Sequence, residues 1–147
     1  MITSRSVLMA SLLFLSKPTV DGSWVQTNGP YGGSVQCFAV SGRNLFAGTD
    51  GGGVFLSTNN GTSWTAPSAV VPNPRYVVAL AVSGTNLFAG TRFGGVFLST
   101  DNGRSWTAVN SGLTTLSIPA LAVSGTNLFA GTSGGGVFRS INKAGRI

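Results

Sequence analysis

Three segments of the chain share one order of apolar and polar residues. Each begins with an almost wholly apolar stretch: VQCFAV from Val35, VVALAV from Val77 and IPALAV from Ile118. A Ser-Gly turn, the stretch NLFAGT, a glycine-rich turn and a short alternating stretch such as VFLST follow. Wholly apolar stretches are typical of strands covered on both faces, and alternation is typical of strands with one covered face. The pattern therefore predicts short strands joined by tight turns.

These segments are copies of one unit. AVSGRNLFAGT begins at Ala39, and AVSGTNLFAGT begins at Ala81 and again at Ala122, so the offsets are 42 (81 − 39) and 41 (122 − 81) residues. Each unit reads as four strands, with repeats that start near residues 35, 77 and 118 and a fourth strand expected from Trp64 or Trp106. Four strands in about 40 residues is the size of one propeller blade. We expect an all-β fold, a partial β-propeller of about three four-stranded blades.

A Ser-x-Asp-x-Gly-x-x-Trp pattern ends two of the units. Its residues are Ser57, Asn59, Gly61 and Trp64 in the first copy and Ser99, Asp101, Gly103 and Trp106 in the second. The pattern resembles the Asp-box of the BNR repeats in sialidase-like propellers. Similar blades occur in sortilin-type receptors, xyloglucan-degrading enzymes and photosystem II assembly factors. The resemblance covers residues 23–147 and implies that the box is a hairpin turn between the third and fourth strands.

The same boxes could be read as calcium loops, but the first copy argues against it. Calcium takes six to eight oxygen ligands, several of them carboxylates. Asn59 replaces Asp101 in the first copy, which keeps a hydrogen-bond acceptor and loses the charge. We therefore expect structural turns and no metal, although a site in the second copy alone stays open. The three tryptophans share one repeat position, which favours packing over a sugar-binding platform.

The inventory of reactive side chains is small. The carboxylates are Asp21, Asp50 and Asp101, and there is no Glu or His. Paired acids or a histidine, which acid–base catalysis and metal sites usually need, are therefore lacking. Cys37 is the single cysteine and is interpreted as a small apolar residue. The triple glycines precede strands rather than helices, so no phosphate loop or other cofactor site is expected. The prediction is that the chain is not an enzyme.

Charge and the first residues bear on partners and location. The net charge is +6, but the cations are scattered, so we expect no nucleic-acid binding. Arg5 precedes a nine-residue apolar run, Val7 to Leu15, which resembles a secretory signal and is too short to cross a bilayer. Residues 1–22 are therefore interpreted as a signal peptide and residues 23–147 as the repeat domain. The mature product is expected to be secreted, periplasmic or in the cell envelope, with no transmembrane segment.

The two ends of the repeat domain are irregular. SWVQTNG from Ser23 matches SWTAVNSG from Ser105, which predicts an isolated fourth strand at the start. After Ser140 the box pattern fails. The chain is interpreted as a fragment of a longer propeller whose open edges favour edge-to-edge self-association or aggregation. We expect a non-catalytic exported binding or scaffold module for an unknown protein or glycan ligand. The alternatives are a remnant of a sialidase-like or other glycoside hydrolase and a photosystem assembly-factor-like chaperone.

Overall fold

The described part of the chain consists of strands and turns. The computed structural model describes residues 22–66 and 74–141, and within these ranges it has ten strands and no helix. The all-β expectation is therefore confirmed. The predicted signal peptide lies outside the described residues, apart from Gly22. No helix of the described part has the length and apolar character that crossing a membrane requires.

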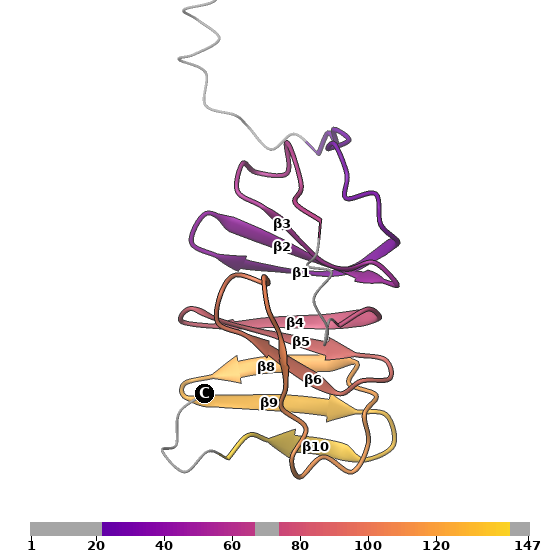
Figure 1. Cartoon of the computed structure of the whole chain (residues 1–147), viewed down its shortest axis with the longest axis vertical. Coiled ribbons are helices and arrows are strands. Elements are labelled where there is room, and N and C mark those ends of the chain that lie inside the picture. The colour runs from indigo at the N-terminus through magenta and orange to yellow at the C-terminus, as the bar shows by residue number, and fades with distance from the viewer. Residues whose placement is uncertain (1–21, 67–73, 142–147) are drawn as a thin grey trace, which may run out of the picture.

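The strands form three antiparallel sheets (Figure 1). Sheet 1 has the order β1-β2-β3, with β1 Ser34–Ser41, β2 Asn44–Asp50 and β3 Gly53–Ser57. Sheet 2 has the order β4-β5-β6-β7, with β4 Val77–Ser83, β5 Asn86–Thr91, β6 Val96–Ser99 and β7 Thr107–Ala108. Sheet 3 has the order β8-β9-β10, with β8 Ala120–Ser124, β9 Asn127–Thr132 and β10 Gly136–Arg139.

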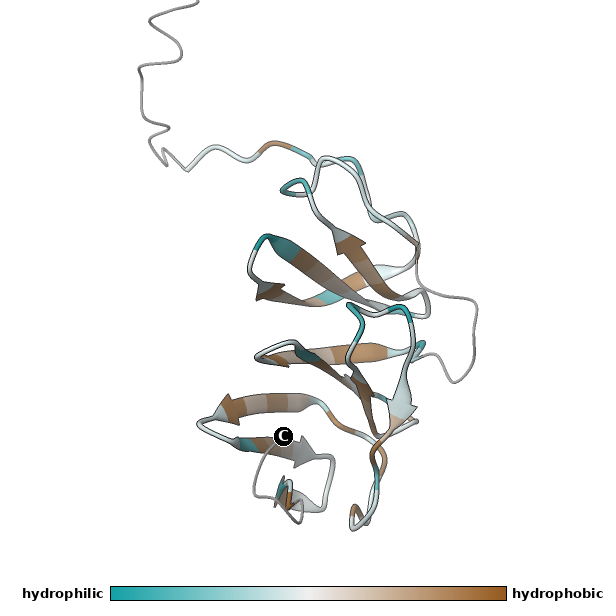
Figure 2. Ribbon diagram, turned by 60° about the vertical axis from the view of Figure 1, so that its left-hand side comes forward, coloured by the Kyte–Doolittle hydropathy of each residue, from teal (hydrophilic) through white to brown (hydrophobic). Residues whose placement is uncertain are grey.

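The sheets stack face to face in chain order, with sheet 2 between the other two (Figures 1 and 2). Contact is closest along the first strand of each sheet, because β1 packs against β4 and β4 packs against β8. Each sheet therefore has a leading face, toward the sheet before it in the chain, and a trailing face, toward the sheet after it. Side chains alternate between the two faces along each strand.

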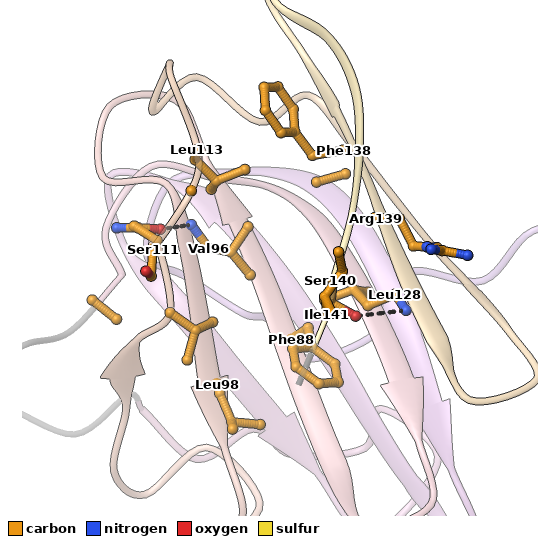
Figure 3. Close-up of a pocket in the computed structure, with 15 residues that line it drawn as sticks. Phe88, Val96, Leu98, Ser111, Leu113, Leu128, Phe138, Arg139, Ser140 and Ile141 are labelled. Carbon is orange, nitrogen blue, oxygen red and sulfur yellow. Dashed lines mark hydrogen bonds between the residues drawn. The ribbon is translucent and has the colours of Figure 1, made fainter. Parts of the chain in front are cut away.

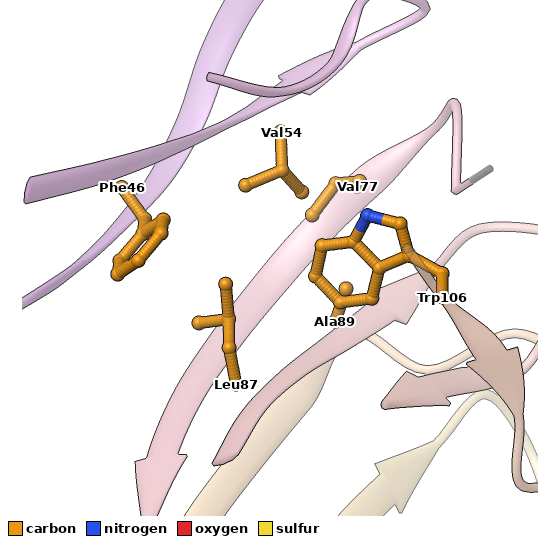
Figure 4. Close-up of a cluster of buried hydrophobic side chains, with 6 residues drawn as sticks. All are labelled: Phe46, Val54, Val77, Leu87, Ala89 and Trp106. Atoms are coloured by element: carbon orange, nitrogen blue, oxygen red, sulfur yellow. The ribbon is translucent and has the colours of Figure 1, made fainter. Parts of the chain in front are cut away.

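One apolar cluster joins sheet 1 to sheet 2 (Figure 4). Sheet 1 contributes Phe46 and Val54 from its trailing face, and sheet 2 contributes Val77, Leu87, Ala89 and Trp106 from its leading face. A second cluster joins sheet 2 to sheet 3 with Phe88 and Val96 facing Ile118, Leu128 and Ala130. These five residues stand 41 or 42 positions after five members of the first cluster. The two interfaces thus repeat one packing arrangement, in which only Trp106 has no counterpart among the described residues.

A glycine in the second strand of sheet 1 and of sheet 2 lets the next sheet approach closely. A Cβ atom built on Gly48 would lie 2.5 Å from Cys37 Sγ and 2.6 Å from Val77 Cγ1. A Cβ atom on Gly90 would lie 2.8 Å from the carbonyl oxygen of Ile118. A methyl group cannot occupy either space without displacement of a neighbour. The glycine of NLFAGT is therefore a packing requirement of the sheet that follows.

The sequence expectation of four strands per unit is met in sheet 2. Among the described residues, the fourth strand of sheet 1 consists of one bridge between Leu56 and Thr65. Sheet 3 has three strands there, and its fourth-strand position lies outside the described residues. The predicted strand at Ser23 is wrong for this structure, since residues 22–33 pair with no strand. A strand needs a neighbouring edge for its backbone hydrogen bonds, and Trp24 does not lie against an edge of any of the three sheets.

Candidate functional site

The strand ends divide the described part into two edges. The hairpin edge carries the turn after β3 (Ser57–Trp64) and the turn after β6 (Ser99–Trp106), called here the first and second hairpin turns. Asn44, at the turn between β1 and β2, donates its side-chain amide to Asn102 at this edge. The linker edge carries the β2–β3, β5–β6 and β9–β10 turns and the segments that lead into β4 and β8.

The two hairpin turns share one hydrogen-bond network around a buried serine hydroxyl. Ser99 Oγ donates to Asp101 Oδ1 at 2.8 Å and accepts from the backbone N–H of Gly103 at 2.8 Å. Asp101 Oδ1 also accepts the backbone N–H of Ser105, and Asp101 Oδ2 accepts its hydroxyl. Both carboxylate oxygens therefore serve the turn itself.

The first hairpin turn reproduces this network with an amide. Ser57 Oγ donates to Asn59 Oδ1 at 3.0 Å and accepts from Gly61 N–H at 2.8 Å. Asn59 Oδ1 accepts the backbone N–H of Ser63, and Asn59 Nδ2 donates to the Ser63 hydroxyl. Asn60 and Gly61 have positive φ angles, as do Asn102 and Gly103, which short amides and glycine tolerate. The same backbone turn forms with either side chain.

The hydrogen bonds that Asp101 accepts keep its carboxyl group ionised. Donation by the Ser105 hydroxyl and backbone, with smaller help from Ser99 and Arg104, lowers the pKa of Asp101 from its ordinary 3.8 to about 2. Donors aimed at a carboxylate favour its ionised form. Asp101 is therefore an anion at neutral pH and has no proton to give as a general acid.

The tryptophans of the hairpin turns differ in their surroundings. Trp106 is 5% exposed, and its indole N–H donates to the Gly103 carbonyl at 3.2 Å. Trp64 is half-buried, and its Nε1 has no hydrogen-bond partner. The ring of Trp106 thus belongs to the interface of Figure 4 and also closes its own turn.

The linker edge gathers charged and aromatic side chains from two sheets. Arg92, in the turn after β5, contacts Asp50 at the end of β2, with 3.3 Å between Nη2 and Oδ2. Tyr76 and Phe93 lie edge to face with their ring centroids 5.4 Å apart, and both rings are exposed. Backbone bonds from Gly51 N–H to the Arg75 carbonyl and from Arg92 N–H to the Tyr76 carbonyl, each 2.9 Å, hold these turns together. We call Asp50, Tyr76, Arg92 and Phe93 the linker-edge cluster.

A cavity of about 720 Å³ opens between sheets 2 and 3 (Figure 3). Its wall is mostly apolar and includes Phe88, Val96, Leu98, Leu128 and Phe138. Asn110 borders it and is held in place, because its oxygen accepts Val96 N–H and its amide donates to the Gly94 carbonyl. The cavity therefore offers mainly apolar surface, although Ser111, Arg139 and Ser140 also line it.

Cys37 and the carboxylates offer little chemistry in the described residues. Burial raises the pKa of the Cys37 thiol to about 11, against a smaller opposite effect from the backbone of Gly48, so the thiol is protonated at neutral pH. The described residues contain no group of three side chains suited to hold a metal ion. Asp50 lies at the linker edge and Asp101 at the hairpin edge, so the two carboxylates do not meet.

Comparison with known proteins bears on the fold. No family model and no curated protein matches the chain. A solved ancestral GH74 enzyme is similar, with a TM-score of 0.58 and 28% identity over 74% of this chain and 15% of its own. The computationally designed Ika4 protein matches with a TM-score of 0.57 and 15% identity over 72% of this chain and 64% of its own. The designed Ika8 protein matches with a TM-score of 0.55 and 16% identity over 71% of this chain and 32% of its own.

The chain folds as part of a β-propeller. Its three antiparallel sheets, stacked through their faces with the first strands adjacent, agree with these neighbours. Each sheet is one blade. The chain spans 15% of the length of the GH74 enzyme, so the activity of that enzyme is not carried over here.

Sequence reasoning missed the linker-edge cluster. Asp50, Arg92 and Ser133 occupy one repeat position with three different side chains, which marks a variable loop rather than a site. The contact between these side chains is visible only in the folded structure, because it joins Asp50 of one blade to Arg92 of the next. The exposed aromatic residues at 76 and 93 have no counterparts at the same positions of the third repeat, Ser117 and Gly134.

Proposed function

We propose that this chain is a non-catalytic, exported propeller module of the BNR/Asp-box type, which binds a protein or glycan ligand at its linker edge. The observation that carries the proposal is the linker-edge cluster. Two exposed aromatic rings in mutual contact stand beside an arginine–carboxylate pair on turns fixed by backbone bonds. Aromatic and arginine side chains are the types that contribute most to binding interfaces.

The distribution of acidic groups supports binding over hydrolysis. Glycoside hydrolysis usually requires two carboxyl groups that flank one bond. Asp50 and Asp101 are the carboxylates of the described residues, and they stand at opposite edges of the blades. Both carboxylate oxygens of Asp101 also accept hydrogen bonds, from Ser99 and from Ser105. In this proposal the chain therefore shares the fold of a glycoside hydrolase without its activity.

The BNR/Asp-box assignment has its own support. Both hairpin turns follow the third strand of a blade. In the second turn, each residue of the pattern has a defined contact: Ser99, Asp101, Gly103 and Trp106. Export is supported by the signal-like residues 1–22 of the sequence. The linker edge has scattered charge, with Arg75 and Arg92 beside Asp50, and this pattern does not favour nucleic acid.

Binding is tested with a panel of immobilised glycans and, in a second arm, with immobilised secreted proteins of the source cells. The wild-type chain is compared with Phe93→Ala, and with Arg43→Ala as a control that removes an exposed side chain of the β1–β2 turn, at the hairpin edge. We expect Phe93→Ala to weaken binding at least tenfold and Arg43→Ala to leave it within about twofold of wild type. Equal binding by wild type and Phe93→Ala would place the site elsewhere, and cleavage of a bound glycan would restore the enzyme reading.

A further inference from the structure

The cavity between sheets 2 and 3 occupies the place of a missing tryptophan. At the preceding interface Trp106 packs in one cluster with Phe46, Val54, Leu87 and Ala89 (Figure 4). Their repeat equivalents Phe88, Val96, Leu128 and Ala130 all line the cavity (Figure 3). The residue that matches Trp106 in the third repeat is Ile147, outside the described residues. The cavity thus has the walls of a tryptophan site.

Trp24, whose neighbours in the sequence match those of Trp106, is exposed at the other end of the stack. Trp24 is 97% exposed and lies in a segment without strand pairing. Ser23-Trp24 and Asn28 match Ser105-Trp106 and Asn110, so this segment has the sequence of a fourth strand. It stands at the end of the stack away from sheet 3 (Figure 1). The tryptophan cannot reach the cavity of its own chain without dismantling the stack.

The exposed outer faces of the array carry matching apolar residues. Val137 on the trailing side of sheet 3 is 74% exposed, whereas its equivalents Val54 and Val96 are 4% and 3% exposed. On the leading face of sheet 1, Phe38 and Val40 are exposed, whereas their equivalents Leu80, Val82, Leu121 and Val123 pack in the two interface clusters. The trailing face of sheet 3 and the leading face of sheet 1 therefore expose apolar residues whose equivalents are packed at the two interfaces within the chain.

We propose that a second copy of this chain completes the third blade. The segment at Ser23–Asn28 of one copy adds to the edge of β10 that pairs with no strand among the described residues of the other copy, and Trp24 enters the cavity between sheets 2 and 3. The register follows sheet 2, where Thr107 pairs with Leu98 and Ala108 pairs with Phe97. By repeat equivalence, Val25 lies opposite Arg139 and Gln26 opposite Phe138 of the partner copy. Addition of a strand to an open edge supplies backbone hydrogen bonds along with the buried ring.

A reciprocal exchange gives a closed dimer. Each copy has one donor segment and one acceptor edge, so two copies related by a twofold axis satisfy both. Two arrays of three blades make six, within the four to eight blades of closed propellers. Asn28 then stands where Asn110 stands in sheet 2, with the Gly135–Val137 turn of the partner copy in place of the Gly94–Val96 turn that Asn110 holds. This inference is independent of the ligand at the linker edge.

Sedimentation velocity of the whole chain tests the proposal. Trp24→Ala removes the inserted ring and, because Trp24 makes no buried contact in the isolated array, leaves the fold intact, as circular dichroism can verify. Phe93→Ala is the control, an exposed aromatic away from both outer faces. We expect wild type and Phe93→Ala to sediment as dimers and Trp24→Ala to dissociate at least tenfold more readily. A wild-type monomer at all concentrations, or a dimer that Trp24→Ala leaves unchanged, would overturn the proposal.

A disulfide test fixes the register. Chains with Val25→Cys are mixed with chains that carry Arg139→Cys, both with Cys37→Ala, and exposed to mild oxidation. Directly opposed residues of antiparallel strands lie within the span that a disulfide bridges. We expect a cross-linked heterodimer within minutes, and at least tenfold less of it when Thr126→Cys replaces Arg139→Cys in the partner, because residue 126 lies in the β8–β9 turn and not on β10. Equal cross-linking by both pairs would refute the register and the exchange.

Discussion

The indole N–H of Trp106 donates to the carbonyl oxygen of Gly103 at 3.2 Å, within one hairpin turn. The same ring packs in the apolar cluster between sheets 1 and 2. One side chain thus links the local turn to blade-to-blade packing. Trp64, at the equivalent position of the first blade, is half-buried and its indole nitrogen has no partner.

We expect Trp106→Ala to destabilise the protein by about 3–5 kcal/mol, because truncation of a buried aromatic residue loses both apolar burial and packing. Trp64→Ala should cost less than half as much, since its ring is only half-buried and no hydrogen bond of its indole is lost. Urea unfolding of the two variants measures the difference. A larger loss for Trp64→Ala would contradict the assignment of the principal anchor to Trp106.

Asp101→Asn should leave stability at pH 7 nearly unchanged. Asn59 already makes the matching bonds to Ser57 and Ser63 with an amide. The melting temperature of the variant at pH 7 checks this expectation. A rise in the wild-type melting temperature with added calcium, absent in Asp101→Asn, would instead establish a metal site in the second turn.

The wild type and Asp101→Asn should differ in their stability at acid pH. The folded pKa of Asp101 is depressed to about 2 from 3.8, so the stability it contributes is present above about pH 4 and is lost as the pH falls toward 2. The wild type should therefore lose more stability than Asp101→Asn between pH 4 and 2. Denaturant midpoints over this range measure the loss, and parallel curves for the two proteins would show that Asp101 is not held as an anion.

Gly90→Ala should destabilise sheet-to-sheet packing, because the added methyl would lie 2.8 Å from the backbone oxygen of Ile118. Gly131→Ala is the matched control at the same repeat position, where the nearest atom is Ala120 Cβ at 3.2 Å. Both changes are made with Trp24→Ala, so that association does not enter the comparison. Thermal unfolding should show the larger loss for Gly90→Ala, and equal losses would mean that the close approach of Ile118 is not required.

Cys37 should react slowly with thiol reagents at pH 8 in the folded protein, because burial raises its pKa to about 11 and the thiolate is the reactive form. The rate should rise steeply toward pH 11 and become fast at pH 8 in denaturant. Stopped labelling with a maleimide, followed by mass spectrometry, measures both rates. Labelling at pH 8 as fast as that of the unfolded chain would show that Cys37 is accessible and reactive.

The repeat made most of the fold predictable from the sequence. Three copies of NLFAGT with flanking apolar stretches fix the strands, the turns and the propeller class, because each copy reports the same structural unit. The linker-edge cluster was not predictable, since Asp50 and Arg92 differ at one repeat position and meet only across two blades. The error at Ser23 has a physical cause as well: its pattern is that of a strand, but a strand forms only where an edge pairs with it.

The central claim is that this chain forms three propeller blades whose two outer faces complete each other. Hydrogen–deuterium exchange of the wild-type chain across a range of concentrations tests it directly. The account predicts that the amides of residues 24–27, and those amides of β10 that do not bond to β9, exchange freely at low concentration and become protected together as concentration rises, because they form one ladder. Free exchange of residues 24–27 at every concentration, whatever happens at β10, would contradict it.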